Sequence, residues 1–244
     1  MAILITVHKF WRYDARMRKT VAPSIPFDYQ LQIPQDAPPE EVIILLHGYM
    51  ESGARALGKM GPSIPDSLRA RAAILAPNGL FPLPIEPENE GDPYKIGFAW
   101  YFYERSSKRY YIDMEPAIDF LTQGLVTLQL DSLPKRIVGF SQGGYLGTLL
   151  GARLESVKQV VGIACEYLHD EVIGKVNYRL DGIHGIEDEV VPLEESKESY
   201  VEMKHARSLT GEFTALSGVG HRMDSSMQKA LHEVLLQVNP STWS

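Results

Sequence analysis

The chain has 244 residues, of which 44% are hydrophobic and 23% charged, enough apolar material for the core of an α/β domain. Its formal net charge of −7 argues against nucleic acid or an anionic lipid surface as its main partner. Cys165 is the only cysteine, so no intrachain disulfide can form. No apolar run approaches the roughly 18–20 residues of a membrane span, and the N-terminal run is too short for a signal peptide. We therefore expect a cytoplasmic protein.

The first part of the chain predicts strands of two kinds. Residues 3–7 predict a strand, and residues 27–33 alternate apolar and polar side chains, which is typical of a half-exposed antiparallel strand. The continuous apolar runs at 42–46 and 72–76 predict strands covered on both faces, as in parallel sheets. Residues 53–71 between them predict a helix interrupted by prolines.

Residues 79–111 form the least regular stretch of the sequence. They contain several prolines, an acidic patch and a cluster of aromatic residues. A connection of this length inside a domain is usually functional, so we expect an irregular lid or substrate wall. The aromatic cluster fits two interpretations equally well, the lining of an acyl pocket and a covering loop packed onto the body.

Strands and helices alternate through the second half of the chain. Such alternation predicts a mostly parallel, doubly wound sheet with helices on both faces, preceded here by antiparallel N-terminal strands. No repeat, low-complexity segment or linker divides the sequence, so residues 1–244 are expected to form a single α/β domain. The expected helices are 113–131, about 145–155, 192–206 and 227–238, and the expected strands are 135–138, 159–165, 178–184 and 213–216.

The most informative motif is Gly139-Phe140-Ser141-Gln142-Gly143-Gly144, which follows a β-rich run and leads into a helix. A strand that turns sharply into a helix needs small residues two before and two after the turn residue, because a β-carbon there would strike neighbouring backbone. Gly139 and Gly143 meet this need, and Gly144 allows the helix to pack closely on the sheet. The motif predicts a nucleophile elbow that presents Ser141 above the carboxyl edge of the sheet.

A serine hydroxyl needs a neighbouring base, and the base needs a third group that holds its tautomer. In a doubly wound sheet these partners lie on loops after later strands. His221 is the expected base, because it lies in a glycine-rich loop between the last strand and the last helix. The rival interpretation is a surface histidine. Four other histidines, which fall in helical or edge segments, are expected to be structural or solvated: His8, His169, His205 and His232.

The expected acid is Asp188, at the centre of a loop between a strand and a helix. Asp181, Glu187 and Glu189 compete with it for this role. Asp181 falls inside the expected strand, and the two glutamates fit solvated loop charges. The order Ser141, Asp188, His221 is the order that α/β-hydrolases use.

An oxyanion needs fixed hydrogen-bond donors, and one good donor lowers the barrier by roughly 3–4 kcal/mol. The backbone amide of Gln142, directly after the serine, is one expected donor. The other should come from the glycine-containing loop after the first central strand, where the amide of Tyr49 is best placed. His47 in that loop is expected to be a structural hydrogen-bonding residue rather than a proton carrier.

Residues 25–238 resemble the phospholipase/carboxylesterase family of small α/β-hydrolases, which includes acyl-protein thioesterase-like enzymes and bacterial carboxylesterases. The elbow and the string His184-Gly185-x-x-Asp188-x-x-Val191-Pro192 are the most specific shared motifs. The remaining shared motifs are Leu46-His47-Gly48, Pro77-Asn78-Gly79, Trp100-Tyr101 and Gly220-His221.

The resemblance implies hydrolysis of a small-molecule ester or thioester without a metal or organic cofactor, and often a homodimer. It also implies Met50, Trp100 and Tyr101 as substrate-binding residues. The chain departs from the family pattern at Tyr49-Met50-Glu51 and at Phe102, both in the expected substrate wall. These departures bear on acyl-chain preference rather than on the reaction type.

Two alternatives remain beside an esterase. One is a peptidase or amidase that uses the same triad, although the chain has no added domain to select peptides. The other is a non-catalytic binding protein with a hydrolase fold, which the intact triad positions and elbow glycines disfavour. Neither the natural substrate nor the choice between ester and thioester follows from the sequence.

Overall fold

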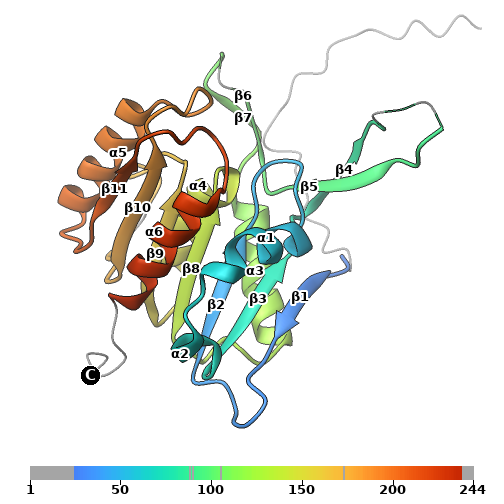
Figure 1. Ribbon diagram of the computed structural model, residues 1–244, viewed down its shortest axis with the longest axis vertical. Helices are drawn as coiled ribbons and strands as arrows, with labels where there is room; N and C mark the ends of the chain where they lie inside the picture. Colours follow the sequence, from blue (N-terminus) through green and yellow to red (C-terminus); the bar gives the residue numbers. More distant parts are fainter. Residues whose placement is uncertain (1–24, 88, 90, 105, 173, 238–244) are drawn as a thin grey trace, which may run out of the picture.

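A seven-stranded sheet crosses the computed structural model, which describes residues 25–237 except 88, 90, 105 and 173 (Figure 1). The strand order is β1-β3-β2-β8-β9-β10-β11. All neighbouring strands are parallel except β1, which pairs antiparallel with β3 at one edge. The strands are β1 (Tyr29–Gln32), β2 (Glu41–Leu46), β3 (Ala72–Pro77), β8 (Lys135–Phe140), β9 (Val157–Ile163), β10 (Arg179–Gly185) and β11 (Phe213–Leu216).

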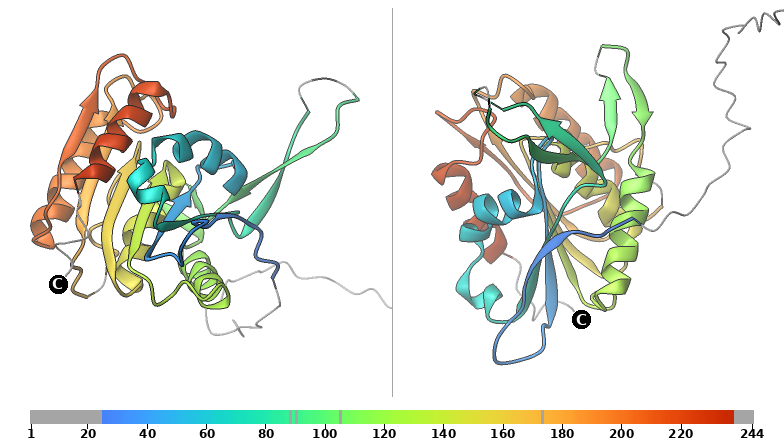
Figure 2. Two further views of the ribbon diagram at one scale, coloured as in Figure 1. Left: turned by 60° about the horizontal axis from the view of Figure 1, so that its bottom comes forward. Right: turned by 90° about the vertical axis from the view of Figure 1, so that its right-hand side faces the viewer.

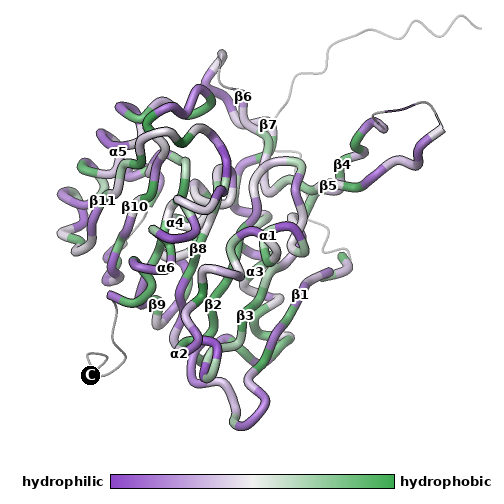
Figure 3. The backbone as a smooth tube through the Cα atoms, viewed as in Figure 1, coloured by the Kyte–Doolittle hydropathy of each residue, from purple (hydrophilic) through white to green (hydrophobic). Residues whose placement is uncertain are grey.

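Burial of the inner strands follows the expected pattern, whereas β1 is more exposed than the half-exposed strand expected there. Every residue of β2, β3 and β8 is buried, whereas all four residues of β1 are exposed. Figure 3 shows the same contrast in colour, with β2 and β3 largely hydrophobic and the outer helix α5 (Leu193–Ala206) largely hydrophilic. The predictions of buried parallel strands and an antiparallel strand near the N-terminus are confirmed. The predicted strand at residues 3–7 lies outside the described residues.

Helices cover both faces of the sheet (Figure 2). On one face α3 (Glu115–Thr127), α4 (Gln142–Arg153) and α5 share a core with alternate residues of the strands, including Ile44 and Ile137. On the other face the strand residues between them, including Ile43 and Val138, pack against a second set of helices. That set comprises α1 (Gly53–Met60), the 3₁₀ turn η2 (Gly61–Ser63), α2 (Asp66–Arg69) and α6 (Ser225–Leu236). This is the doubly wound α/β arrangement that the sequence predicts.

β10 is an inner strand, although its sequence gives only a weak strand pattern. Asp181 and His184 interrupt its apolar run, yet both are buried. The Asp181 carboxylate accepts hydrogen bonds from the Gln159 side chain at 2.8 Å and from Arg179 at 2.9 Å. Buried polar groups with such partners are tolerated in a sheet interior, so polarity at these positions does not mark an edge.

The stretch expected to be irregular contains two antiparallel hairpins, which corrects that part of the prediction. β4 (Phe81–Ile85) pairs with β5 (Lys95–Ala99), and β6 (Phe102–Glu104) pairs with β7 (Arg109–Ile112). Prolines 82 and 84 within β4 made a strand look unfavourable, but each strand of a two-stranded ribbon has a free edge where proline is tolerated. Figure 1 shows both hairpins extending beyond the main sheet. Among the described residues, no helix has the length and apolar character needed to cross a bilayer.

Candidate active site

Ser141 occupies the sharp turn between β8 and α4, with backbone angles φ 52° and ψ −121°. A β-carbon at Gly139 would lie 2.1 Å from the Gly143 carbonyl oxygen, and one at Gly143 would lie 2.4 Å from the Leu46 carbonyl oxygen. The positive φ is a strained conformation for serine, and it is held because strand and helix pack against each other on both sides. The two glycines are therefore required by the geometry that raises Ser141 above the sheet edge.

The structure brings Ser141, His221 and Asp188 together from three separate loops. The His221 Nε2 atom lies 2.9 Å from the Ser141 hydroxyl oxygen, and its Nδ1 atom lies 2.8 Å from the Asp188 carboxylate. Because a carboxylate only accepts hydrogen bonds, Nδ1 carries a proton and donates to Asp188. In the neutral ring, Nε2 is then the acceptor that faces the serine hydroxyl. The Phe140 ring packs 5.2 Å from the His221 ring and helps to fix its orientation.

Asp188 is the only one of the four candidate acids that contacts His221 in the described structure. Its side chain is buried, and its second oxygen accepts hydrogen bonds from the backbone amides of Val190 and Val191 at 2.9 and 2.8 Å. These amides hold the carboxylate in one orientation. The Glu187 carboxylate accepts instead from the Val219 amide at 2.9 Å, which ties the acid loop to the histidine loop.

His184 lies beneath the acid loop and is fully buried. Its Nε2 donates to the Val191 carbonyl at 2.9 Å and lies 3.5 Å from the Asp188 carboxylate. Burial lowers the pKa of His184, which favours the neutral ring. A neutral His184 leaves His221 as the hydrogen-bonding partner of Asp188.

The backbone amides of Tyr49 and Gln142 are the expected oxyanion donors, and both residues line the same cavity as Ser141. Neither the Tyr49 nor the Gln142 amide has an acceptor among the described residues. The Tyr49 loop is fixed against β5, because the Met50 amide donates to the Phe98 carbonyl at 2.9 Å and the Phe98 amide donates to the Glu51 carbonyl at 2.8 Å. Met50 has a positive φ of 60° in this turn. Amides held free in a rigid loop suit the stabilisation of a developing negative charge.

His47 is a buried structural residue, as the sequence analysis expects. Its Nε2 accepts from the Gly79 amide at 2.8 Å, so its Nδ1–H donates to the Gly48 carbonyl at 2.7 Å. Burial lowers the pKa of His47 to about 4, and the ring is therefore neutral at physiological pH. With both ring nitrogens occupied, His47 shapes the oxyanion loop and carries no proton to the substrate.

Trp100 lies under the site rather than on its wall, which corrects the expected substrate contact. Its side chain is fully buried, stacks on His47 with ring centroids 4.7 Å apart, and donates its indole N–H to the His47 carbonyl at 2.9 Å. The Trp-aromatic motif indicated proximity to the site but not which way the indole points. Trp100 supports the oxyanion loop from below.

The Gln142 side chain has a second role that sequence reasoning missed. Its carbonyl accepts from the Trp100 amide and its amino group donates to the Tyr101 carbonyl, both at 2.9 Å. Only the backbone amide of Gln142 followed from the motif, because these partners lie about 40 residues upstream. The side chain fastens the elbow to the wall of the site.

A cavity of about 1320 Å³ opens beside Ser141 and Gln142. Of the expected substrate-binding residues, Tyr101 lines this cavity, whereas Met50 and Trp100 do not. Within the described part of the chain, no cluster of three or more His, Cys, Asp or Glu side chains could hold a metal ion. The other tyrosines that line the cavity are Tyr49, Tyr103, Tyr110, Tyr111 and Tyr145.

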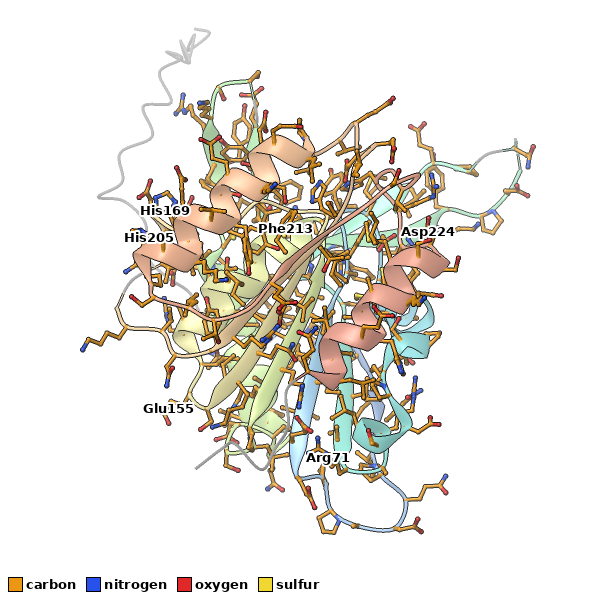
Figure 4. The ribbon with its side chains drawn as sticks, turned by 60° about the vertical axis from the view of Figure 1, so that its left-hand side comes forward. Arg71, Glu155, His169, His205, Phe213 and Asp224 are labelled. Carbon is orange, nitrogen blue, oxygen red and sulfur yellow. The ribbon has the colours of Figure 1, made fainter. Side chains whose placement is uncertain are left out.

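The remaining histidines lie away from the triad. His169 and His205 lie near the C-terminal end of α5 (Figure 4), and His232 on α6 contacts the Ser63 carbonyl at 3.1 Å. His8 lies outside the described residues. Among the described histidines, only His221 contacts Ser141.

We predict that Gly143→Ala damages both folding and the site. The new β-carbon would press on the Leu46 backbone, so stability should fall by about 1–3 kcal/mol and activity by roughly 100-fold. Gly58→Ala is the matched control, because nothing lies within 4 Å of that β-carbon in α1, and it should stabilise by about 0.5–1 kcal/mol. Denaturant unfolding measures the stability of each variant, and ester turnover measures its activity. Wild-type behaviour of Gly143→Ala would contradict the steric argument.

The low pKa of His47 predicts a pH dependence of stability. The pKa of His47 is about 4 in the folded chain and has its ordinary value of about 6.5 in the unfolded chain. As the pH falls from about 7 to 5, the unfolded chain therefore binds a proton that the folded chain does not bind. The free energy of unfolding falls by about 2 kcal/mol as a result. His47→Gln should lose stability overall but show a correspondingly smaller fall between these pH values. Urea unfolding at both pH values measures this, with His205→Gln as the control for the substitution. An equal fall in the free energy of unfolding for His47→Gln and for the wild type would refute the low pKa of His47.

The chain is similar to known proteins both in sequence and in fold. The sequence model described as Phospholipase/Carboxylesterase matches residues 118–238. No curated protein sequence matches the chain significantly. The structure matches esterase PE8 with a TM-score of 0.67 and 21% identity, covering 87% of this chain and 99% of that protein.

Two plant proteins share the fold at similar distance. Zea mays acyl-protein thioesterase 2 matches with a TM-score of 0.64 and 15% identity, over 86% of this chain and 98% of the other. Arabidopsis thaliana SOBER1 matches with a TM-score of 0.61 and 18% identity, over 81% and 98%. At these identities the structural matches show the fold alone, and the family is given by the sequence match. The chain belongs to the phospholipase/carboxylesterase family of α/β-hydrolases, a family of esterase- and thioesterase-type enzymes.

Proposed function

We propose that the protein hydrolyses carboxylic esters, or thioesters, through an acyl-enzyme formed on Ser141. The observation that carries this proposal is the hydrogen-bonded chain from the Ser141 hydroxyl through His221 to Asp188, with contacts of 2.9 and 2.8 Å. A nucleophile, a base and a group that orients the base are what acyl transfer requires. Ser141 lines a large cavity, which gives a substrate access to its hydroxyl.

In the first half-reaction the Ser141 oxygen attacks the acyl carbonyl while His221 Nε2 takes the hydroxyl proton. Asp188 stabilises the imidazolium through the Nδ1–H bond. The Tyr49 and Gln142 amides donate to the oxyanion of the tetrahedral intermediate. His221 then protonates the leaving alcohol or thiol, and the acyl group remains on Ser141.

In the second half-reaction a water molecule takes the place of the leaving group. His221 removes a proton from this water, and the resulting nucleophile attacks the acyl-enzyme. Collapse of the second intermediate releases the carboxylic acid, and the proton on His221 returns to Ser141. The cycle needs only the groups already present in the triad and the two amides.

The substrate is proposed to be a small-molecule ester that lies against Tyr101 and the other residues of the cavity wall. Cytoplasmic activity is the proposed setting, supported by the single, fully buried Cys165, which needs no oxidising compartment. A peptidase and a non-catalytic binding protein are the alternatives that the experiment below separates.

We predict hydrolysis of p-nitrophenyl esters, tested as a chain-length series from acetate to palmitate. Stopped-flow recording should show a burst of nitrophenol equal to the enzyme concentration, because acylation by an activated ester outruns deacylation. Ser141→Ala should lower turnover by more than about 1,000-fold while the protein stays folded. Turnover that survives in Ser141→Ala would contradict the proposal. Absence of turnover on every ester, with amide substrates cleaved, would favour the peptidase alternative.

A further inference from the structure

The turn that carries the Tyr49 amide is strained. Residues 48–51 form this turn, which is closed by a hydrogen bond from the Glu51 amide to the Gly48 carbonyl at 3.2 Å. Met50, its third residue, has a φ of 60°, in the left-handed region that favours glycine. A methionine stays in such a conformation only where surrounding contacts hold it. The contacts of this turn therefore bear on the position of the proposed oxyanion donor.

The Glu51 side chain closes the same turn a second time. Its Oε2 atom accepts a hydrogen bond from the Gly48 amide at 3.3 Å. Its Oε1 atom forms an ion pair with the ammonium group of Lys59, in the last turn of α1. The Glu51 side chain is only 15% exposed, and among the described residues its one other basic neighbour is Arg55, at 3.8 Å and 64% exposed. The short contact to Lys59 thus ties the turn to the far end of α1.

The ion pair also contacts the residue that precedes the nucleophile. The Lys59 ammonium nitrogen lies 5.5 Å from the centroid of the Phe140 ring, and this ring packs against His221. Gly48 lies against the same ring, because a β-carbon at Gly48 would lie 3.1 Å from Phe140 and 3.5 Å from the Ser141 β-carbon. Lys59 therefore joins the turn to the packing that surrounds Ser141 and His221.

The charges of this pair matter beside a site where negative charge develops. A lone carboxylate in the turn would repel an oxyanion bound at the Tyr49 amide, because like charges disfavour each other. The ammonium group of Lys59 offsets that repulsion while it holds the Glu51 carboxylate in place. An exposed ion pair does little for a protein, but this carboxylate is mostly buried and also accepts from the backbone of the turn.

We propose that Glu51 is a positioning residue for the reaction. Through the Gly48 amide it holds the turn that presents the Tyr49 amide to the oxyanion, and Lys59 neutralises its charge. This inference rests on the proposed esterase function and identifies what fixes one of its two oxyanion donors.

Glu51→Ala removes the acceptor of the Gly48 amide and frees the turn. We expect kcat for p-nitrophenyl acetate to fall by roughly 10- to 100-fold, because a misplaced donor stabilises the oxyanion less. KM should change by less than about threefold, because both half-reactions form an oxyanion and slow together. An ion pair that serves stability alone would change the free energy of unfolding and leave kcat of the folded enzyme unchanged.

An alkyl trifluoromethyl ketone isolates the oxyanion contact from the rest of catalysis. The Ser141 oxygen bonds to the ketone carbon, the hydroxyl proton passes to His221, and the carbonyl oxygen becomes the oxyanion. The inhibition constant of this ketone should rise in Glu51→Ala by about the factor by which kcat/KM falls, because both report stabilisation of the same charge.

Variants of Lys59 test the charge part of the inference. Lys59→Met keeps the apolar stem but leaves the Glu51 carboxylate without its close partner, so kcat should fall by roughly tenfold. Glu51→Gln/Lys59→Met has no charge at either position and keeps a side-chain oxygen for the Gly48 amide. Its kcat should recover to within about threefold of the wild type. Recovery in the neutral pair is not expected if the ion pair acts only through stability.

Arg55→Met is the matched control, because Arg55 approaches the same Glu51 oxygen from the same helix but is exposed and more distant. Its kcat and inhibition constant should stay within about twofold of the wild type. Denaturant unfolding confirms that every variant is folded under the assay conditions. Wild-type kcat and inhibition constant in Glu51→Ala would overturn the inference and leave the esterase proposal intact.

A wild-type protein that hydrolyses no ester would overturn the esterase proposal instead. Amide hydrogen exchange then decides whether Glu51 holds the turn, because the Met50 and Glu51 amides keep their acceptors, the Phe98 and Gly48 carbonyls, in every variant. Glu51→Ala should speed the exchange of these two amides by at least about tenfold, whereas Arg55→Met should not. Unchanged exchange in Glu51→Ala would refute the inference.

Discussion

The missing side chain at Gly143 is the constraint on which the rest of the site depends. A β-carbon there would lie 2.4 Å from the Leu46 carbonyl oxygen, so β2 and the start of α4 can approach this closely only around a glycine. The approach places the Gln142 amide beside the loop that follows β2 and holds Ser141 in its strained turn. The proposed nucleophile and the proposed oxyanion donors are thus positioned by one packing contact at the carboxyl edge of the sheet.

A network of buried polar groups carries this arrangement outward to the cavity. Trp100 donates to the His47 carbonyl, and Gln142 bridges Trp100 and Tyr101. The oxyanion loop, the elbow and the wall of the cavity therefore form one hydrogen-bonded unit. A group displaced in any of the three would displace the other two, because buried polar groups are costly to leave without partners. This coupling explains why a fully buried tryptophan belongs to the site without touching the cavity.

The parts of the site that follow from the sequence are those fixed by local backbone geometry. The elbow glycines restrict Ser141, and loop positions after parallel strands place Asp188 and His221 at the same sheet edge. The arrangement of residues 79–111 could not be predicted, because proline argues against strands unless a free edge is known to exist. The direction of Trp100 depends on a partner about 50 residues away. Glu195, Glu198 and Glu202 of α5 line the cavity, which did not follow from the sequence, because packing on the sheet decides which face of the helix meets the cavity.

The cavity and the triad make different demands on the chain. The triad needs rigid placement, which buried Asp188 and its two backbone donors provide. The cavity is lined by carboxylates and tyrosines that come from several segments of the chain.

The most direct test of the central claim is the structure of the protein after reaction with a p-nitrophenyl alkylphosphonate. The phosphonate should be bonded to Ser141, with one phosphonyl oxygen about 2.7–3.1 Å from the amide nitrogens of both Tyr49 and Gln142. His221 should remain hydrogen-bonded to Asp188. A folded protein that is not labelled, a label on another residue, or an oxygen that points away from both amides would contradict the account.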